Sequence, residues 1–393
     1  MSPSNQRATG TLVEIPTCGL GSAARDGPVL GVAQRGKEAD MSTSFDEAKA
    51  GAFAEQLLAS FNGAAAMSLT AAGYAAGLFE ALAGQEPATS EQIAARTGLQ
   101  QRYVHEWAAG SATAGILEYD PAAKTFALPH EHAAFLTKAA GPNNLGHMTQ
   151  YIPLMLANFD KIVEAFRSGG GVGYEHFPNF ATLQGEESTP LFDAMLVDVM
   201  LPLASGIPER LASGIRVLEL GCGVGHAANL IAQAFPNSTV TGLDFNEQGI
   251  VIARKEAAEL GLSNVSFEPV DVASAGGTYD LVVAFDVIHD LAQPSLVLRQ
   301  LHDVLADDGT LFIMDINASS DLEDNAAHPM GTGFYFFSLF HCMTVSLAQG
   351  GEGLGTAWGR QKATQMLQEA GFSSVEAKEI EGDFFHIFYV ARK

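Results

Sequence analysis

Residues 219–225 read Glu-Leu-Gly-Cys-Gly-Val-Gly, and this stretch decides the fold. It directly follows the strand-like run RVLEL at 216–220 and leads into the helical run GHAANLIAQAF at 225–235. Glycines at these spacings let the backbone turn tightly and let a ligand approach the main chain without a Cβ in the way. The turn lacks the G-x-G-x-x-G spacing that supports a pyrophosphate, which disfavours a dinucleotide. We therefore expect another ligand at this strand–turn–helix unit, in preference to a tight turn that binds nothing.

Strand-like and helical runs alternate from this turn to the end of the chain. The strand-like runs lie at 216–220, 238–245, 264–271, 279–290, 309–316, 374–381 and 385–392. Such alternation indicates an α/β fold with a mostly parallel sheet and helices on both of its faces. Ligands of such sheets bind at the carboxyl ends of the strands. The glycine turn and the acids described next all fall at those ends.

Three aspartates end the strands that follow the glycine turn. Asp244 ends the second strand, 19 residues after Gly225, where a carboxylate can accept both hydrogen bonds of a ribose diol. Asp271 ends the third strand, where it can receive an amino group such as that of adenine, and Asp286 lies at the end of the fourth. Each alone is equally compatible with capping the helix that follows it. Their combination around one glycine turn favours a nucleoside-containing ligand.

In this combination, residues 215–393 resemble the class I S-adenosylmethionine-dependent methyltransferases. The resemblance implies a Rossmann-like, seven-stranded, mostly parallel sheet with an antiparallel last strand, and S-adenosylmethionine as cofactor. It implies that Asp244 holds the ribose, that Phe245 lies against adenine, and that Asp271 and Val272 flank the adenine edge. The residues that would surround the methionine portion are Glu219, Gly221, Gly223 and Gly225, with Asp286 near its amino end.

Residues 44–130 carry the pattern of a winged helix-turn-helix. The first part of this range has apolar residues at helical spacing. A helix follows, with a capping box formed by Thr89 and Gln92, and after it come a second helix and two short β-like runs. This module resembles the winged-helix dimerisation domain that precedes the catalytic domain of many small-molecule O-methyltransferases. The apolar residues on its helices, Phe53, Leu57, Phe61, Leu78 and Phe79, predict a homodimer.

A closer similarity extends from about Ser68 to the C-terminus. It is to a group of poorly characterised bacterial methyltransferases with the same two-domain plan. The shared stretches are FDVIHD, SSDLEDNAAHP and HCMTVSLAQGGEGLGTAWG. This similarity implies no particular substrate.

Histidines near the fourth strand and in a later insertion are the candidates for proton transfer. His289 and Asp290 follow Asp286 on the loop that faces the transferred methyl group in this fold. Histidine titrates near neutral pH, so His289 is a candidate general base, with His341 as the second candidate. A purely orienting role for His289 is equally compatible with the sequence, because methyl transfer depends more on alignment than on proton chemistry. The histidines and acids have no tight ligand spacing, so we predict no metal.

The segment 317–356 is longer than a connector needs and mixes aromatic residues with the glycine run GGEGLG. Long loops of this kind are usually functional. We expect a lid or pocket wall, although most of its aromatic residues are individually compatible with ordinary packing.

The sequence thus predicts that the chain is divided into four parts. They are a disordered tail at 1–43, the winged-helix domain at 44–130, a helical linker and substrate cap at 131–210, and the cofactor-binding domain at 211–393.

Composition narrows the class of partner. Apolar residues make up 47% of the 393 residues and charged residues 17%, which excludes an intrinsically disordered protein. The 45 acids and 21 bases give a formal charge of −24, which disfavours nucleic acids and anionic membranes as partners. The three cysteines form no C-x-x-C pair, which favours a reducing, cytoplasmic location.

The function that these observations predict is methylation of a small molecule, with an oxygen acceptor favoured and sulfur or nitrogen as alternatives. The rival function is a transcription regulator whose winged helix binds DNA and whose α/β domain senses a ligand. The predicted recognition helix at 98–115 contains one arginine, Arg102, and one glutamate, Glu106. These two side chains together give it no net positive charge. Such a helix is poorly suited to phosphate contacts.

Overall fold

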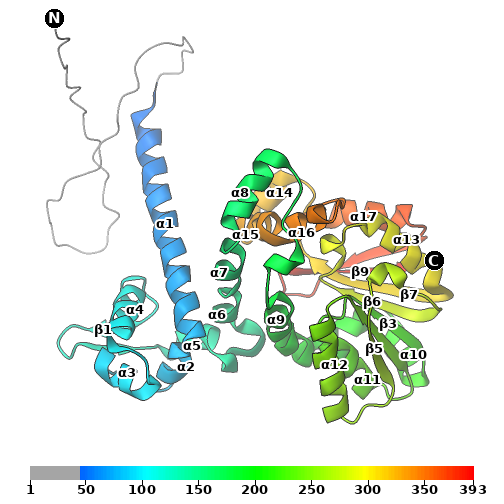
Figure 1. Cartoon of the computed structure of the whole chain (residues 1–393), viewed down its shortest axis with the longest axis horizontal. Coiled ribbons are helices and arrows are strands. Elements are labelled where there is room, and N and C mark those ends of the chain that lie inside the picture. The colour runs from blue at the N-terminus through cyan, green and yellow to red at the C-terminus, as the bar shows by residue number, and fades with distance from the viewer. Residues whose placement is uncertain (1–44) are drawn as a thin grey trace, which may run out of the picture. The chain divides into compact units, whose positions relative to one another are not determined.

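The structure is a computed structural model that describes residues 45–393 (Figure 1). The predicted tail at 1–43 lies outside the described residues. Internal contacts divide the chain into two compact units. Unit 1 contains the described residues up to Gly73 together with Gln85–Leu128, and unit 2 contains Tyr74–Gly84 together with Pro129–Lys393.

Unit 1 has the predicted winged-helix elements. They are α1 (Glu47–Ala75, whose last two residues belong to unit 2), α3 (Ser90–Thr97), α4 (Gln101–Thr113), β1 (Glu118–Asp120) and β2 (Thr125–Ala127). The capping box is confirmed, because Thr89 accepts from the Gln92 N–H while the Gln92 side chain accepts from the Thr89 N–H. Trp107 of α4 is buried, and its Nε1 donates to the carbonyl of Leu69 on α1 at 2.9 Å. This bond and the burial around it join α1 to the helix-turn-helix.

Unit 2 begins with a series of short helices, here called the cap. They are α2 (Leu78–Leu82), α5 (His130–Leu136), η1 (Lys138–Asn143), α6 (Leu145–Met148), α7 (Tyr151–Leu156), α8 (Phe159–Ser168), η2 (Tyr174–His176), α9 (Phe180–Met195), the π-helical turn η3 (Leu196–Met200), η4 (Leu201–Leu203) and α10 (Ile207–Ser213). The helical run around residues 192–203 changes geometry along its length. It changes from α to π at Leu196 and to 3₁₀ geometry at Leu201.

The cap leads into the predicted α/β sheet. Its strands are β3 (Arg216–Leu220), β4 (Thr239–Asp244), β5 (Val265–Pro269), β6 (Tyr279–Phe285), β7 (Leu305–Ile316), β8 (Ser374–Lys378) and β9 (His386–Arg392). Their order is β5-β4-β3-β6-β7-β9-β8. Strands β3 to β7 pair in parallel, and β9 lies antiparallel between β7 and β8. The seven-stranded, mostly parallel, Rossmann-like fold class is therefore confirmed.

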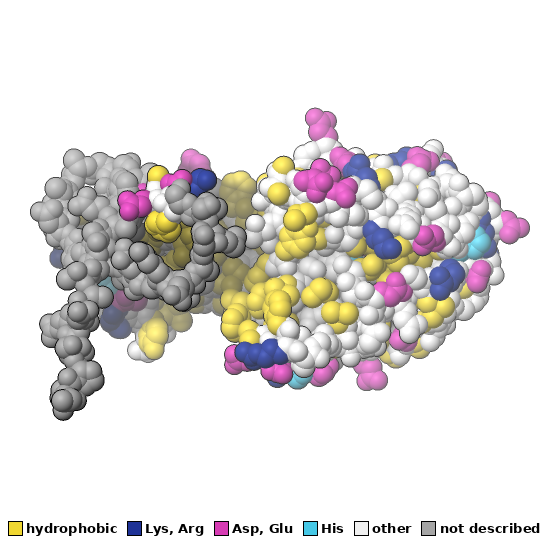
Figure 2. Space-filling view, turned by 90° about the horizontal axis from the view of Figure 1, so that it is seen from above, with side chains coloured by type: hydrophobic (Ala, Val, Ile, Leu, Met, Phe, Trp, Pro, Cys, Tyr) yellow, Lys and Arg dark blue, Asp and Glu magenta, His cyan; other side chains and the backbone are white. Residues whose placement is uncertain are grey.

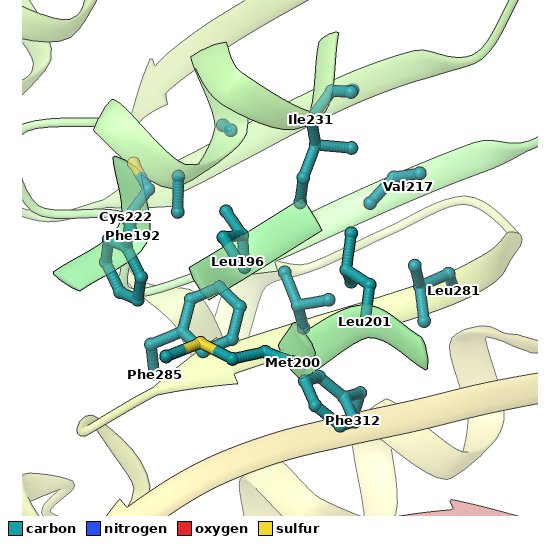
Figure 3. Close-up of a cluster of buried hydrophobic side chains, with 14 of the residues drawn as sticks. Phe192, Leu196, Met200, Leu201, Val217, Cys222, Ile231, Leu281, Phe285 and Phe312 are labelled. Carbon is teal, nitrogen blue, oxygen red and sulfur yellow. The ribbon is translucent and has the colours of Figure 1, made fainter. Parts of the chain in front are cut away.

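Helices cover both faces of this sheet. They are α11 (His226–Ala234), α12 (Glu247–Glu259), η5 (Val272–Ser274), η6 (Ile288–Asp290), α13 (Pro294–Val304) and α17 (Gly359–Glu369). Consecutive strand residues point to opposite faces, so Val217 belongs to one buried cluster and Leu218 to the other. Figure 3 shows how the first cluster joins the cap to the sheet, with Leu196, Met200 and Leu201 lying beside side chains of the strands.

The predicted insertion at 317–356 is helical. It contains α14 (Leu322–Ala327), α15 (Gly331–Phe337), the π-helical turn η7 (Ser338–Cys342) and α16 (Met343–Ala348), followed by a glycine-rich loop at 350–355. Val345 of α16 packs into a buried cluster with Ile162, Val172 and Phe177 of the cap. The insertion and the cap therefore enclose the carboxyl edge of the sheet together.

The face shown in Figure 2 has acidic side chains interspersed with fewer basic ones, in keeping with the charge of −24. No single helix in the described range 45–393 is long and apolar enough to cross a membrane. One bent pair, Phe180–Leu203 with Ile207–Ser213, passes a length and composition test only when its two arms are taken together.

Gly225 gives a direct test of the turn. A Cβ at Gly225 would overlap the Cβ of Ala253 and lie 2.6 Å from the Phe267 ring, and its φ of 74° is left-handed. We expect Gly225→Ala to lose about 2–5 kcal/mol of unfolding free energy, because left-handed strain and overpacking add. Gly261 has a similar φ of 68° but open space around it, so Gly261→Ala should lose only the strain, about 1–2 kcal/mol. Urea unfolding measures both variants, and equal losses would contradict the packing argument.

Candidate functional site

The glycine turn between β3 and α11 is held in left-handed backbone geometry. Gly221, Gly223 and Gly225 have φ values of 66°, 53° and 74°. A Cβ at Gly221 would overlap Val287, whereas a Cβ at Gly223 would meet no atom within 4 Å. Gly221 and Gly225 are therefore required for packing within the protein. Gly223 borders open space, as expected where a ligand approaches the main chain.

Asp244 lies at the end of β4 and is tied to this turn. Its Oδ2 accepts from the Gly223 N–H at 2.8 Å, and its Oδ1 accepts from the Asn246 N–H at 2.8 Å. Burial raises the pKa of this carboxyl group, while the two backbone bonds act in the opposite direction. Each carboxylate oxygen can accept a further bond. The predicted ribose-binding carboxylate is thus also a structural part of the turn, which the sequence did not indicate.

Glu219 lies in β3 immediately before the turn and is buried. Burial raises its pKa to about 8, and the charge of Asp244 adds to the shift. Within the described part of the chain, Oε2 of Glu219 has no hydrogen-bond partner. A buried acid with an unused oxygen beside a ligand turn is a candidate contact for a polar or cationic ligand group.

The residues predicted to flank adenine lie further out. Asp271 is exposed and accepts from the Ala273 N–H at 2.8 Å, as expected for the capping alternative. Val272 begins η5, and its side chain lies outside the description. Phe245 is 57% exposed, and its ring centroid lies 5.1 Å from that of Tyr174 in η2. Tyr174 was missed by the sequence reasoning, because nothing in the pattern of residues 174–176 connects them with the end of β4.

Asp286 directly follows β6 and has an unusual backbone. Its φ of 52° is left-handed for a residue that is not glycine, and such strain concentrates at functional sites. Burial raises its pKa to about 6, although the nearby His386 lowers it. Oδ1 of Asp286 is buried without a hydrogen bond from any described residue.

Two further pairs that the sequence reasoning missed interact electrostatically with Asp286. Burial alone would lower the pKa of His386, but its hydrogen bond to Asp383 at 2.8 Å and the charge of Asp286 raise it. Tyr151 of the cap donates to Oε2 of Glu187 at 2.6 Å, and burial raises the pKa of Glu187. His386 begins β9, which pairs with the end of β7 and therefore starts at the carboxyl edge.

His289 is buried between two carboxylates. Its Nδ1 lies 2.8 Å from Oδ1 of Asp315, and its Nε2 lies 3.4 Å from Oδ1 of Asp290. Burial alone would lower the pKa of His289, but the charges of Asp315 and Asp290 raise it well above the usual value. Asp315 also accepts from the Trp358 indole N–H at 3.1 Å. An acid near the end of the fifth strand was the available signal for Asp315, and the sequence reasoning did not use it.

His341 of η7 completes the cluster. It is fully buried, and its ring stacks on Phe180 with centroids 3.7 Å apart. Its Nδ1 lies 3.7 Å from Oδ2 of Asp290, and neither ring nitrogen has a hydrogen bond from the described residues. Burial lowers its pKa to about 4. The three predicted catalytic residues, His289, Asp290 and His341, therefore meet in one place, although they are 52 positions apart in sequence at most.

The glycine-rich loop at 350–355 holds this cluster together. Gly355 donates to the carbonyl of His289 at 3.2 Å, and Glu352 donates to that of Ala292 at 2.8 Å. A Cβ at Gly351 would lie 2.6 Å from the backbone of Ala292, and one at Gly355 would overlap the Ser338 hydroxyl. The glycines thus allow the insertion to lie directly on the backbone of the loop after β6.

Two family models match parts of the chain. Residues 211–371 match the family described as a methyltransferase domain, and residues 64–138 match the Rv2258c-like winged HTH domain. Among curated relatives, the malonyl-[acyl-carrier protein] O-methyltransferase of Bacillus anthracis is 35% identical over 104 residues. That stretch is 25% of this chain and 36% of the relative, so the chain spans well under two thirds of the relative's length.

Solved structures share the fold over most of the chain. The mitomycin 7-O-methyltransferase MmcR has a TM-score of 0.67 at 16% identity, covering 88% of this chain and 100% of the other. Human N-acetylserotonin methyltransferase in complex with SAM has a TM-score of 0.60 at 18% identity, covering 90% of this chain and 99% of the other. At these identities the likeness is one of fold.

Asp244 is the residue on which the ligand assignment can be tested. We expect Asp244→Ala to bind S-adenosylhomocysteine, an analogue of the implied cofactor, about 100-fold or more weakly, since two charge-assisted bonds contribute about 1.5–3 kcal/mol each. Calorimetry measures the affinity, and unfolding measures the part of the effect that comes from the turn. Asp303→Ala, at an exposed site on α13, is the control and should bind as wild type does. Unchanged affinity in Asp244→Ala would show that the ligand assignment is wrong.

Proposed function

We propose that this chain, whose residues 211–371 form a methyltransferase domain, transfers a methyl group from S-adenosylmethionine to a small-molecule acceptor. The observation that carries the proposal is the meeting of the left-handed glycine turn with the buried acids Glu219 and Asp244 and the partly buried Asp286 at one edge of the sheet. The family match and the fold shared with methyltransferases support it.

The residues present suit this cofactor. Asp244 offers free lone pairs for a ribose diol, and Gly223 leaves its main chain approachable. The unused oxygens of Glu219 and Asp286 suit a ligand that carries positive charge, as the ammonium and sulfonium groups of S-adenosylmethionine do. When bound, the cofactor supplies an electrophilic methyl group. The chain's own residues hold it, exclude water and align the acceptor.

The acceptor side favours a small molecule. The cap and the insertion meet over the carboxyl edge through aromatic contacts, such as that of Tyr151 with Phe337 at 5.5 Å. Such walls suit an apolar or aromatic acceptor whose lone pair attacks the methyl group in line with the sulfonium. An oxygen acceptor is preferred, because structures that share the fold include O-methyltransferases, and sulfur and nitrogen remain the alternatives.

A DNA-binding regulator is the weaker candidate. Arg102 on α4 forms an ion pair with Glu106 one turn later, so this helix offers no spare positive charge at those positions. The winged-helix unit serves better as an assembly module than as a DNA reader.

The proposal is tested by calorimetry with S-adenosylhomocysteine, followed by a radiolabelled methyl-transfer screen of phenols, thiols, amines and carboxylic acids. Saturable binding of the analogue and label in an organic-soluble product are expected. Absence of binding, or sequence-specific retardation of genomic DNA fragments in its place, would overturn the proposal.

The catalytic assignment of His289, Asp290 and His341 stays a prediction. Replacing His289 by Gln should lower kcat by about 10²–10⁴-fold while leaving the affinity for S-adenosylhomocysteine unchanged, if proton removal passes through this cluster. His302→Gln, on α13 away from the cluster, is the matched control and should retain wild-type turnover. A loss below about tenfold would leave His289 an orienting residue and would favour an acceptor that needs no deprotonation.

We propose a homodimer formed through α1. In this helix only Thr70, Ala71 and Gly73 are buried, whereas Phe53, Leu57 and Phe61 are 62%, 59% and 71% exposed. Leu78 and Phe79, which the sequence assigned to the same exposed surface, are instead buried and do not contribute to it. An exposed apolar stripe of this size is typical of an interface.

Light scattering at micromolar concentration should therefore give twice the chain mass for the wild type. The double variant Phe53→Glu/Phe61→Glu should be monomeric, because it places charges in the apolar stripe. Tyr103→Glu, which alters an exposed aromatic residue on α4 instead, should remain dimeric. A monomeric wild type would rule out this assembly.

The cytoplasmic location stays a prediction from cysteine usage.

A further inference from the structure

We propose that His289, Asp290 and Cys342 form a binding site for one zinc ion, with a fourth coordination position left open. A nitrogen of His289, a carboxylate oxygen of Asp290 and the sulfur of Cys342 lie within 4.8 Å of one another, and all three residues are buried. Zinc binds histidine nitrogen, cysteine sulfur and carboxylate oxygen, and in its catalytic sites three protein ligands leave one position for water or substrate. The sequence contains no compact ligand motif, because Cys342 lies 53 positions after His289 and 52 after Asp290, and only the fold brings them together.

The surroundings of His289 are those of a metal-binding imidazole. Nδ1 is held by Asp315 at 2.8 Å, which fixes the ring and leaves Nε2 directed toward Asp290. Histidines that bind metals almost always donate their other ring N–H to a carboxylate or carbonyl in this way. Asp315 is itself held by the Trp358 indole at 3.1 Å and by the Ile316 N–H at 2.8 Å. The ring orientation is therefore fixed before any ion binds.

Unsatisfied polar atoms give independent support. Oδ1 of Asp290 and both ring nitrogens of His341 are buried and have no hydrogen bond from the described residues. Buried polar atoms without partners are rare and call for an explanation such as an ion. A cation held by Asp290 would compensate its charge and occupy its unused oxygen. His341, whose Nδ1 lies 3.7 Å from the other oxygen of Asp290, stands next to the open position.

The backbone that presents these ligands is constrained. Cys342 and His341 lie on the π-helical turn η7, a rare geometry that is frequent at functional sites. His289 and Asp290 lie on η6, and the Gly355 N–H holds the carbonyl of His289 at 3.2 Å. The two ligand-bearing turns are thus joined by the glycine-rich loop rather than free to separate.

The competing explanation is a proton. Asp315 and Asp290 raise the pKa of His289 well above its usual value despite its burial, so a protonated imidazole also balances part of the negative charge. Neither a proton nor an ion bound by these three ligands supplies a partner for the His341 nitrogens, and a proton needs no thiolate from Cys342. The role of Cys342 is therefore what separates the two explanations.

The inference deepens the proposed function. A zinc ion with an open position lowers the pKa of a bound hydroxyl or thiol, so it would activate an acceptor with His289 serving as a ligand. Only that role rests on the proposed function. Binding of the ion itself is measured without cofactor or acceptor.

The experiment uses the full chain stripped of metal by a chelator and titrated with Co²⁺ as a spectroscopic substitute for Zn²⁺. We expect saturation at one equivalent per chain, a near-ultraviolet thiolate-to-cobalt band, and loss of the spectrum when Zn²⁺ is added. Cys342→Ser should lose the near-ultraviolet band. The control Cys222→Ser, which replaces the other described cysteine, should keep it. Asp315→Asn should retain the band but bind about 10–100-fold more weakly, as expected for loss of an outer carboxylate.

Two results would overturn the inference: a wild type without a saturable cobalt spectrum, or a band unaffected by Cys342→Ser. Far-ultraviolet circular dichroism checks that each variant is folded, and Asp315→Asn supplies the decisive comparison if Cys342→Ser does not fold. Calorimetry with S-adenosylhomocysteine runs in parallel. Analogue binding without a cobalt site defeats only this inference, whereas a cobalt site without analogue binding defeats only the proposed function.

Discussion

The hydrogen bond from the Gly223 N–H to Oδ2 of Asp244, at 2.8 Å, joins the turn after β3 to the end of β4, and the candidate site depends on this joint. It forms only because the turn is left-handed, and left-handed backbone at three alternating positions requires glycine there. The same turn is closed from the other side by α12, since a Cβ at Gly249 would lie 2.5 Å from the carbonyl oxygen of Gly223. The turn is consequently rigid before a ligand arrives, and a ligand pays little conformational entropy to bind there.

Acidic side chains collect at the carboxyl edge beyond that joint. Glu219, Asp244, Asp290 and Asp315 are buried there, and His289 is the histidine in direct contact with the last two. Burial raises the pKa of Glu219 to about 8 and that of Asp286 to about 6, which shows the cost of keeping both ionised. An edge of this kind is stabilised by protons or by cationic ligands. A positively charged cofactor and a metal ion are two ways to meet the same electrostatic requirement.

The sequence predicted what depends on local pattern. The seven strands follow from hydrophobic runs and breaks, and the capping box at Thr89 follows from two residues three positions apart. The meeting of Asp290 with His341 could not be predicted from the sequence, because that contact depends on where a helical insertion folds back. Asp315, Tyr174 and Glu187 were missed for the same reason, since their partners lie on elements distant in sequence. The prediction that Leu78 and Phe79 contribute to the dimer surface was wrong, because both are buried within the chain. Periodicity alone does not tell which apolar face is buried in this way.

The insertion shows how packing and function are divided among its aromatic residues. Phe334 is buried as an ordinary packing residue is, whereas Phe337 and Phe340 reach the cap. The ring of Phe340 is stacked on that of Phe159, with the two ring centroids 6.4 Å apart. The contact of Phe337 with Tyr151 has a further consequence for the site. Tyr151 donates to Glu187, and Glu187 interacts electrostatically with both Tyr151 and Asp286. A displacement of α15 would therefore alter both the apolar wall and the electrostatic environment of Asp286. The insertion is thus connected to the cofactor side through the cap, as well as directly through the glycine-rich loop on His289.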